Sequence, residues 1–163
     1  MKILSMKTTI FLGAILSLLV CLMFTGCSNS ETNSTSRGLT DFAHIEEEYL
    51  ATIDSLNWPD GITLPDKLED EDTGASFQVG YGETRASYLW EYSWMKEWLD
   101  TYNTDPERAE KALEELEKAF DMPYMGIDRC DDATRNYLRE NIDKAKLGDP
   151  SGFTESIRAN YAN

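Results

Sequence analysis

The sequence has few of the residues that crosslink a chain or hold a metal ion. Its 163 residues include 3 cysteines and 1 histidine, and no cluster of them has the spacing of a zinc site. The phosphate-binding loop and the nucleophile-elbow pentapeptide are also missing. The sequence therefore has none of these motifs by which an enzyme or metalloprotein class is recognised. We therefore predict no cofactor, no metal site and no assigned catalytic residue.

Basic residues are scarce as well. The chain holds 15 lysines and arginines against 30 aspartates and glutamates, which gives a formal net charge of −15. Such a surface repels phosphate backbones and anionic lipid head groups. Nucleic acid is therefore excluded as a partner, and the protein is not expected to adsorb to an anionic membrane without an anchor.

The first residues have the pattern of a secretory signal peptide. Two lysines precede a charge-free run that is mostly apolar over residues 10–24 and ends in small residues at 25 and 26. A positive start, an apolar centre of about 7–15 residues and small residues at the cut are typical of export signals. We predict a signal peptide over residues 1–26. The alternative is an uncleaved membrane anchor, and both place the domain outside the cytoplasm because no positive cluster follows the apolar run.

The end of this segment resembles the lipobox of bacterial lipoproteins. Residues 22–27 read LMFTGC, with small residues before the cysteine, although Phe24 stands where a branched aliphatic residue is usual. The resemblance implies cleavage between Gly26 and Cys27 and a diacylglycerol on the sulfur of Cys27. It also implies that the protein contacts the membrane through lipidated Cys27 and faces the extracytoplasmic side of the cell membrane.

The rest of the chain divides into a tether and one domain. Residues 27–38 contain no apolar side chain after Cys27, which predicts a flexible polar tether. Residues 39–163 are then an acidic helical domain of ordinary size. Because Cys21 leaves with the signal peptide and Cys27 takes the lipid, Cys130 has no partner for an internal disulfide.

Apolar residues recur at spacings of three and four through most of this domain, which predicts helices. The expected ranges are residues 41–56, 82–102, a third helix that begins near 104, 131–147 and 152–161. The long connection after the first helix ends in an extended segment, residues 77–82, for which no partner strand is visible. We predict an all-α fold, an irregular bundle of four to five helices with a long wrapped loop between helices one and two.

Aromatic residues concentrate in the second predicted helix. Trp90, Trp94 and Trp98 are each four residues apart and form a stripe beside a face of tyrosines. One interpretation buries this stripe at the centre of the bundle. The other exposes part of it as a stacking surface for a sugar, a peptide or a partner helix. On the second interpretation, the three tryptophans are the candidate binding residues.

Two further patterns suggest chemistry without specifying it. Cys130 and the single histidine, His44, allow a Cys–His pair formed from distant parts of the chain. The acidic run over residues 66–72 fails the spacing of an EF-hand loop in either frame. It therefore predicts a solvated loop with at most weak, nonspecific cation binding.

The function expected from these features is broad. Residues 77–94 have the spacing F-x2-G-Y-G-x3-A-x3-W-x3-W, which loosely resembles a stretch in uncharacterised exported proteins of Gram-positive bacteria and implies no activity. We expect an exported, lipid-anchored interaction or ligand-binding module for an envelope protein or a small ligand. The alternatives are a cell-envelope hydrolase that uses acidic residues or the Cys130–His44 pair, and a structural surface protein without a ligand.

Overall fold

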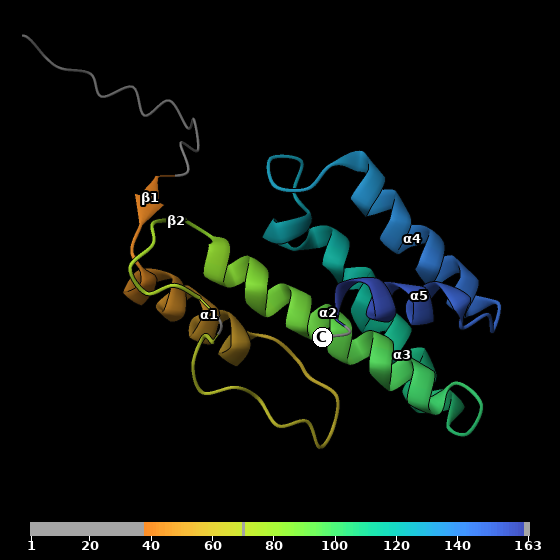
Figure 1. The fold of residues 1–163 in the computed structure, drawn as a ribbon. Helices are drawn as coiled ribbons and strands as arrows, with labels where there is room; N and C mark the ends of the chain where they lie inside the picture. Colours follow the sequence, from red (N-terminus) through yellow and green to blue (C-terminus); the bar gives the residue numbers. More distant parts are fainter. Residues whose placement is uncertain (1–37, 70, 162–163) are drawn as a thin grey trace, which may run out of the picture. The chain divides into compact units, whose positions relative to one another are not determined.

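The computed structural model describes residues 38–69 and 71–161 (Figure 1). The predicted signal peptide, the cleavage site at Gly26 and the lipidation site at Cys27 lie outside the described residues. The described residues form five α-helices, two short strands and two 3-10 helices. In chain order these are β1 (Leu39–Thr40), α1 (Phe42–Ser55), β2 (Phe77–Gln78), α2 (Tyr81–Thr101), α3 (Pro106–Glu117), η1 (Lys118–Asp121), η2 (Pro123–Met125), α4 (Asp132–Lys146) and α5 (Ser151–Asn160). The all-α prediction is confirmed.

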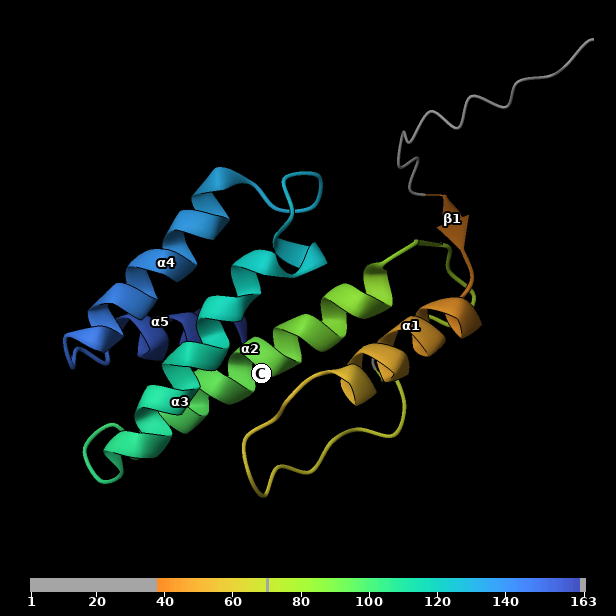
Figure 2. The same ribbon diagram turned by 180° about the vertical axis from the view of Figure 1, so that it is seen from behind.

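The longest helix, α2, is the centre of the bundle (Figure 1 and Figure 2). Its 21 residues extend about 31 Å at the usual rise of an α-helix. Helices α1 and α3 both pack along α2, and α5 returns to it from much later in the sequence. Helix α4 packs on α3 and α5. Neighbours therefore cover α2 on several sides. None of the described helices combines the length and the apolar character needed to cross a membrane.

Two glycines allow α1 to cross close to the start of α2. A Cβ on Gly82 would lie 1.8 Å from the carbonyl oxygen of Ile45, so no larger residue fits there. Gly80 has a φ of 87°, in the left-handed region that favours glycine. The carboxylate of Glu48 in α1 accepts hydrogen bonds from the amides of Gly80 and Gly82, at 2.7 and 3.1 Å. Close packing thus explains the G-Y-G spacing seen in the sequence.

The tryptophan stripe belongs to the core. Trp90 and Trp94 are 1% exposed and Trp98 is 2% exposed, because α2 is packed on several sides. The indole N–H groups of Trp90 and Trp94 both donate to the carbonyl oxygen of Asn57, at 2.8 and 3.2 Å. The buried interpretation is therefore the one that the structure supports. The stripe offers no exposed ring face to a sugar, a peptide or a partner helix.

The connection between α1 and α2 is fixed at both ends. Its beginning is held by the two indoles at Asn57, and its end is β2, which pairs antiparallel with β1. The register matches Leu39 with Gln78 and Thr40 with Phe77. The prediction that this extended segment lacks a partner strand is wrong. The partner is only two residues long, which is too short for an alternating pattern to reveal it.

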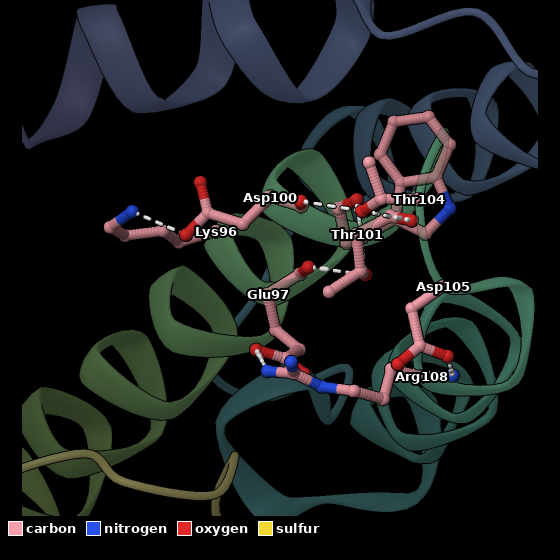
Figure 3. A network of polar contacts seen from close by, with 8 residues as sticks. Lys96, Glu97, Asp100, Thr101, Thr104, Asp105 and Arg108 are labelled. Carbon is pink, nitrogen blue, oxygen red and sulfur yellow. Dashed lines mark hydrogen bonds and ion pairs between the residues drawn. The ribbon is translucent and has the colours of Figure 1, made fainter.

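Charged and hydroxyl side chains hold the turn between α2 and α3 (Figure 3). Arg108 donates from Nε and Nη2 to the two carboxylate oxygens of Glu97, at 2.7 and 2.9 Å, the two-point geometry that suits this pair. Asp105 caps α3 by accepting from the amide of Arg108 at 3.2 Å. These contacts fix α3 against the second half of α2 and support the core around Trp98.

Helix α5 completes the bundle by a second close crossing. A Cβ on Gly152 would lie 2.5 Å from Oδ1 of Asn141 in α4. The ring of Phe153 meets Trp98 edge-on, with centroids 5.4 Å apart. From this position α5 runs along α2 and brings Tyr161, the residue after the helix, onto the ring of Tyr92 with centroids 4.9 Å apart.

Candidate functional site

The most unusual side chain in the described structure is Glu91, in the middle of α2. At about 100° per residue it lies on the opposite side of the helix from the polar arc around Ser93 and Asp100. It is only 7% exposed. Burial of a carboxylate is costly unless hydrogen bonds and a positive charge compensate it, and no ion pair to Glu91 forms among the described residues.

One hydrogen bond satisfies half of this carboxylate. The phenolic hydroxyl of Tyr124, in η2, donates to Oε2 of Glu91 at 2.8 Å. No hydrogen bond to Oε1 forms within residues 38–69 and 71–161. Oε1 is not among the fully enclosed polar atoms that lack a partner, so it keeps contact with solvent. Burial raises the pKa of Glu91 to about 7, and the hydrogen bond from Tyr124 opposes this rise by a smaller amount. The group is therefore divided between its neutral and charged forms at neutral pH.

Glu91 forms part of the wall of a pocket of about 410 Å³, within the range of small-molecule sites. Helix α2 contributes one wall, α4 a second, and η2 and the end of α5 the remainder. The lining residues are Tyr88, Glu91, Met125, Thr134, Tyr137, Leu138, Ser156, Asn160 and Tyr161. A largely apolar pocket with a few polar groups and a carboxyl of displaced pKa is the usual form of a binding or active site.

Tyrosine rings form much of the pocket. Tyr88 meets Tyr124 edge-on with centroids 5.6 Å apart, and the Tyr161 hydroxyl donates to the carbonyl oxygen of Tyr88 at 3.3 Å. Burial raises the pKa of the phenols of Tyr88, Tyr124 and Tyr161. All three are therefore uncharged at neutral pH. The tyrosines that line the pocket are Tyr88, Tyr137 and Tyr161, of which Tyr88 and Tyr137 are exposed to a similar extent.

Ser156 is a second polar group with unused hydrogen-bonding capacity. It is 3% exposed and its side chain lines the pocket. Its backbone carbonyl accepts from Nδ2 of Asn160 at 3.1 Å. Its hydroxyl makes no hydrogen bond among the residues that the structure describes, and it is not one of the fully enclosed polar atoms that lack a partner, so it keeps contact with solvent. Glu91 and Ser156 reach the pocket from α2 and α5, so a ligand between these helices can contact both.

A wider groove of about 750 Å³ adjoins this pocket and shares Tyr88, Asn160 and Tyr161 with it. Its basic lining residues are Arg85 and Lys67. Arg85 donates to Glu71 at 2.6 Å, and Lys67 lies 3.0 Å from Glu69. These pairs neutralise the basic charges of the groove, and neither Arg85 nor Lys67 lines the pocket of Glu91.

No hydrogen bond joins Cys130 and His44, the pair predicted as one alternative, in the described structure. Nε2 of His44 lies 3.3 Å from Glu48, whereas Sγ of Cys130 lies 3.5 Å from both Sδ of Met125 and the carbonyl oxygen of Asp131. The polar contacts of the two residues therefore lead to different neighbours. Burial also raises the pKa of the Cys130 thiol, so the group is not an activated thiolate.

The acidic residues on the surface form a structural contact and no metal site within the described ranges. Glu71 accepts hydrogen bonds from Tyr81 and Arg85, at 2.7 and 2.6 Å, which fastens the acidic loop to α2. The described residues contain no group of three or more side chains placed to hold a metal ion. Glycoside hydrolysis by the common route needs two carboxyl groups, and Glu91 is the single acid among the described residues of its pocket.

Sequence reasoning missed Glu91, although a signal for it was present. A helical wheel places Glu91 among Trp98, Met95 and Tyr88, inside the apolar arc rather than the polar one. An acidic residue at such a position is either buried or part of a site. Its hydrogen-bond partner Tyr124 and the pocket wall from α5 depend on tertiary packing, and no spacing in the sequence indicates them.

Comparisons with models of known protein families, with curated proteins and with solved structures find no match for this chain. A function for it must therefore be inferred from the chemistry of the site.

Proposed function

We propose that this protein is an exported, lipid-anchored ligand-binding module whose site is the tyrosine-lined pocket at Glu91. The export signal and the Cys27 lipobox support the location, and the polar segment over residues 27–38 supports a tethered display. The pocket volume of about 410 Å³ suits one small molecule. In this role the bundle is a rigid frame that holds the pocket outside the cytoplasm.

One observation carries the proposal, namely the half-satisfied carboxylate of Glu91. A carboxyl group that is 7% exposed and has a single phenol as partner is destabilising to the fold at neutral pH. An apolar residue of similar size at this position would make the fold more stable than the Glu91 carboxylate does. The free-energy cost of burying Glu91 has a reason if a ligand donates a hydrogen bond to Oε1. Polar groups at a pocket wall that are free to form hydrogen bonds fix the orientation of bound molecules.

The direct test blocks the pocket and asks whether binding is lost. Thr134 lines the pocket from the exposed first turn of α4, so Thr134→Trp fills the cavity without a change in the core. Thr154 is equally exposed on α5 and lies outside the pocket lining, which makes Thr154→Trp the matched control. Ligand-observed NMR with the full-length chain in detergent measures binding across a library of small charged and neutral metabolites.

We expect at least one compound that binds the unmodified protein and the Thr154→Trp variant but not the Thr134→Trp variant. Circular dichroism on both variants checks that the helices remain. If every compound that binds does so equally to both variants, the pocket is not the ligand site and the proposal fails.

A further inference from the structure

We propose that the pocket at Glu91 takes a small organic cation that carries an ammonium group. This inference rests on the proposed function and specifies the ligand class of the same site. It follows from three properties of the pocket: its single uncompensated carboxylate, its tyrosine walls and the open hydroxyl of Ser156.

The charges that line the pocket favour a cationic ligand. Among the described residues the Glu91 carboxylate makes one hydrogen bond, at Oε2, and none of the described residues that line the pocket is basic. Arg135 on α4 lies outside the pocket lining and already donates to the carbonyl oxygens of Met125 and Cys130 and pairs with Asp132. A ligand ammonium therefore supplies the counter-charge that the protein does not.

The walls suit such a ligand. Tyr88, Tyr137 and Tyr161 line the same pocket as the carboxylate, and aromatic rings attract alkylammonium ions through their electron-rich faces. The hydroxyl of Ser156 accepts a hydrogen bond from an N–H or O–H group of the ligand. An anion at this place meets the Glu91 charge with no basic residue to offset it. The net charge of −15 further favours the approach of cations.

The groups that face Glu91 come from every neighbouring element. They are Tyr88 on α2, Tyr124 on η2, Tyr161 after α5 and the Cys130 thiol before α4. The negative charge of Glu91 contributes to the raised pKa of each of these groups. All four are neutral at neutral pH. Glu91, with a pKa of about 7, is therefore the group whose titration controls cation binding in this range.

The experiment measures the affinity of choline for the full-length chain in detergent by isothermal titration calorimetry. The matched ligand is 3,3-dimethyl-1-butanol, which has the shape of choline without its charge. The variant is Glu91→Gln, which keeps the shape of the side chain. The control variant is Glu115→Gln, because Glu115 is also buried but pairs with Lys118 away from the pocket.

We expect choline to bind the unmodified protein and Glu115→Gln alike, and to bind Glu91→Gln about 30-fold more weakly, as for truncation of a buried charge pair. The neutral alcohol binds at least about tenfold more weakly than choline. The affinity for choline also falls about 20-fold from about pH 8 to about pH 5, because at a pKa of about 7 almost all of Glu91 is neutral at the lower pH and the neutral acid binds choline as weakly as the Gln variant. This pH profile needs no variant and holds even if Glu91→Gln fails to fold.

The outcomes separate the ligand class from the function. If neutral compounds bind as well as choline, or if Glu91→Gln leaves choline affinity unchanged, the cation inference is wrong while the binding function stands. If the Thr134→Trp variant binds the same compounds as the unmodified protein, the binding function itself is wrong. Butylamine and 1-butanol repeat the comparison for a primary ammonium ion.

Discussion

Tyr124 donates its hydroxyl hydrogen to Oε2 of Glu91 across 2.8 Å, and the two residues are 33 positions apart in the chain. This single bond joins the central helix α2 to the 3-10 helix η2. It lowers the pKa of Glu91 against a larger rise from burial. The bond therefore moderates, but does not remove, the cost of a carboxylate in the core.

The Glu91 carboxylate makes the fold less stable as the pH rises. Its pKa rises from 4.5 to about 7 on folding, so the folded state binds its proton more tightly than the unfolded chain. This stabilisation is complete below about pH 4.5 and is lost as the pH rises to about 7. In Glu91→Gln, we expect the free energy of unfolding relative to the unmodified chain to increase by about 3 kcal/mol across this range, at about 1.4 kcal/mol per pKa unit.

Urea unfolding of the full-length chain at a series of pH values measures this difference. Glu115→Gln is the control, because its carboxylate is buried beside Lys118 and repeats the general charge loss without the Glu91 environment. A difference between Glu91→Gln and the unmodified chain that stays constant with pH would contradict the assignment.

Tyr124→Phe removes the one donor to Glu91. We expect the pKa of Glu91 to rise above about 7, and the free energy of unfolding above that pH to fall by about 1–3 kcal/mol, the cost of an unmet buried polar group. A carbon-13 NMR titration of the glutamate carboxyl groups measures the pKa. Tyr137→Phe is the control, because this tyrosine lines the same pocket but is more exposed and makes no hydrogen bond to Glu91 in the described structure. Equal pKa values in both variants would show that the Tyr124 bond has no influence.

Gly82→Ala tests the crossing of α1 over α2. The added methyl would lie 1.8 Å from the carbonyl oxygen of Ile45, and 2.9 Å from the amide nitrogen of Tyr49, so the helices must separate. We expect a loss of about 3 kcal/mol or more in the free energy of unfolding, at the upper end of overpacking costs. Gly38→Ala is the control, because nothing lies within 4 Å of its Cβ position. Equal unfolding midpoints for the two variants would contradict the close crossing.

The anchor is tested by mass spectrometry of the mature amino terminus. We expect a chain that begins at Cys27 and carries a diacylglycerol, and we expect Cys27→Ser to lose that mass and to stay uncleaved. An unmodified Cys27, or a mature chain that starts elsewhere, would overturn the lipoprotein proposal. Cys21→Ser is the control, since bulky Val20 precedes it and the resemblance assigns it no role.

Helix positions were the most predictable part of this molecule. Each predicted range lies within one or two residues of an observed helix, since the three- and four-residue spacing of the core side chains is itself what packs the helix. The 3-10 helices η1 and η2 were missed because three or four residues contain no full period. The partner of β2 was missed for the same reason, as β1 is two residues long.

The candidate site was hardly predictable, and the physical reason differs for each part. Trp90, Trp94 and Trp98 were candidate binding residues because their spacing is regular. Regular apolar spacing, however, is typical of side chains that pack in a core. Glu91 breaks that regularity and was overlooked. The walls of its pocket come from four segments far apart in the sequence, and their meeting depends on close crossings such as that of Gly152 over Asn141.

The β1–β2 pair has a mechanical consequence. The described structure begins at Gly38, whose carbonyl oxygen accepts a hydrogen bond from the Val79 amide at 3.0 Å beside this pair. A pulling force applied at Gly38 therefore acts first on a few backbone hydrogen bonds beside the first turn of α2. These bonds yield before the helical core does, so the pair acts as a weak mechanical link that shields the Glu91 pocket from load.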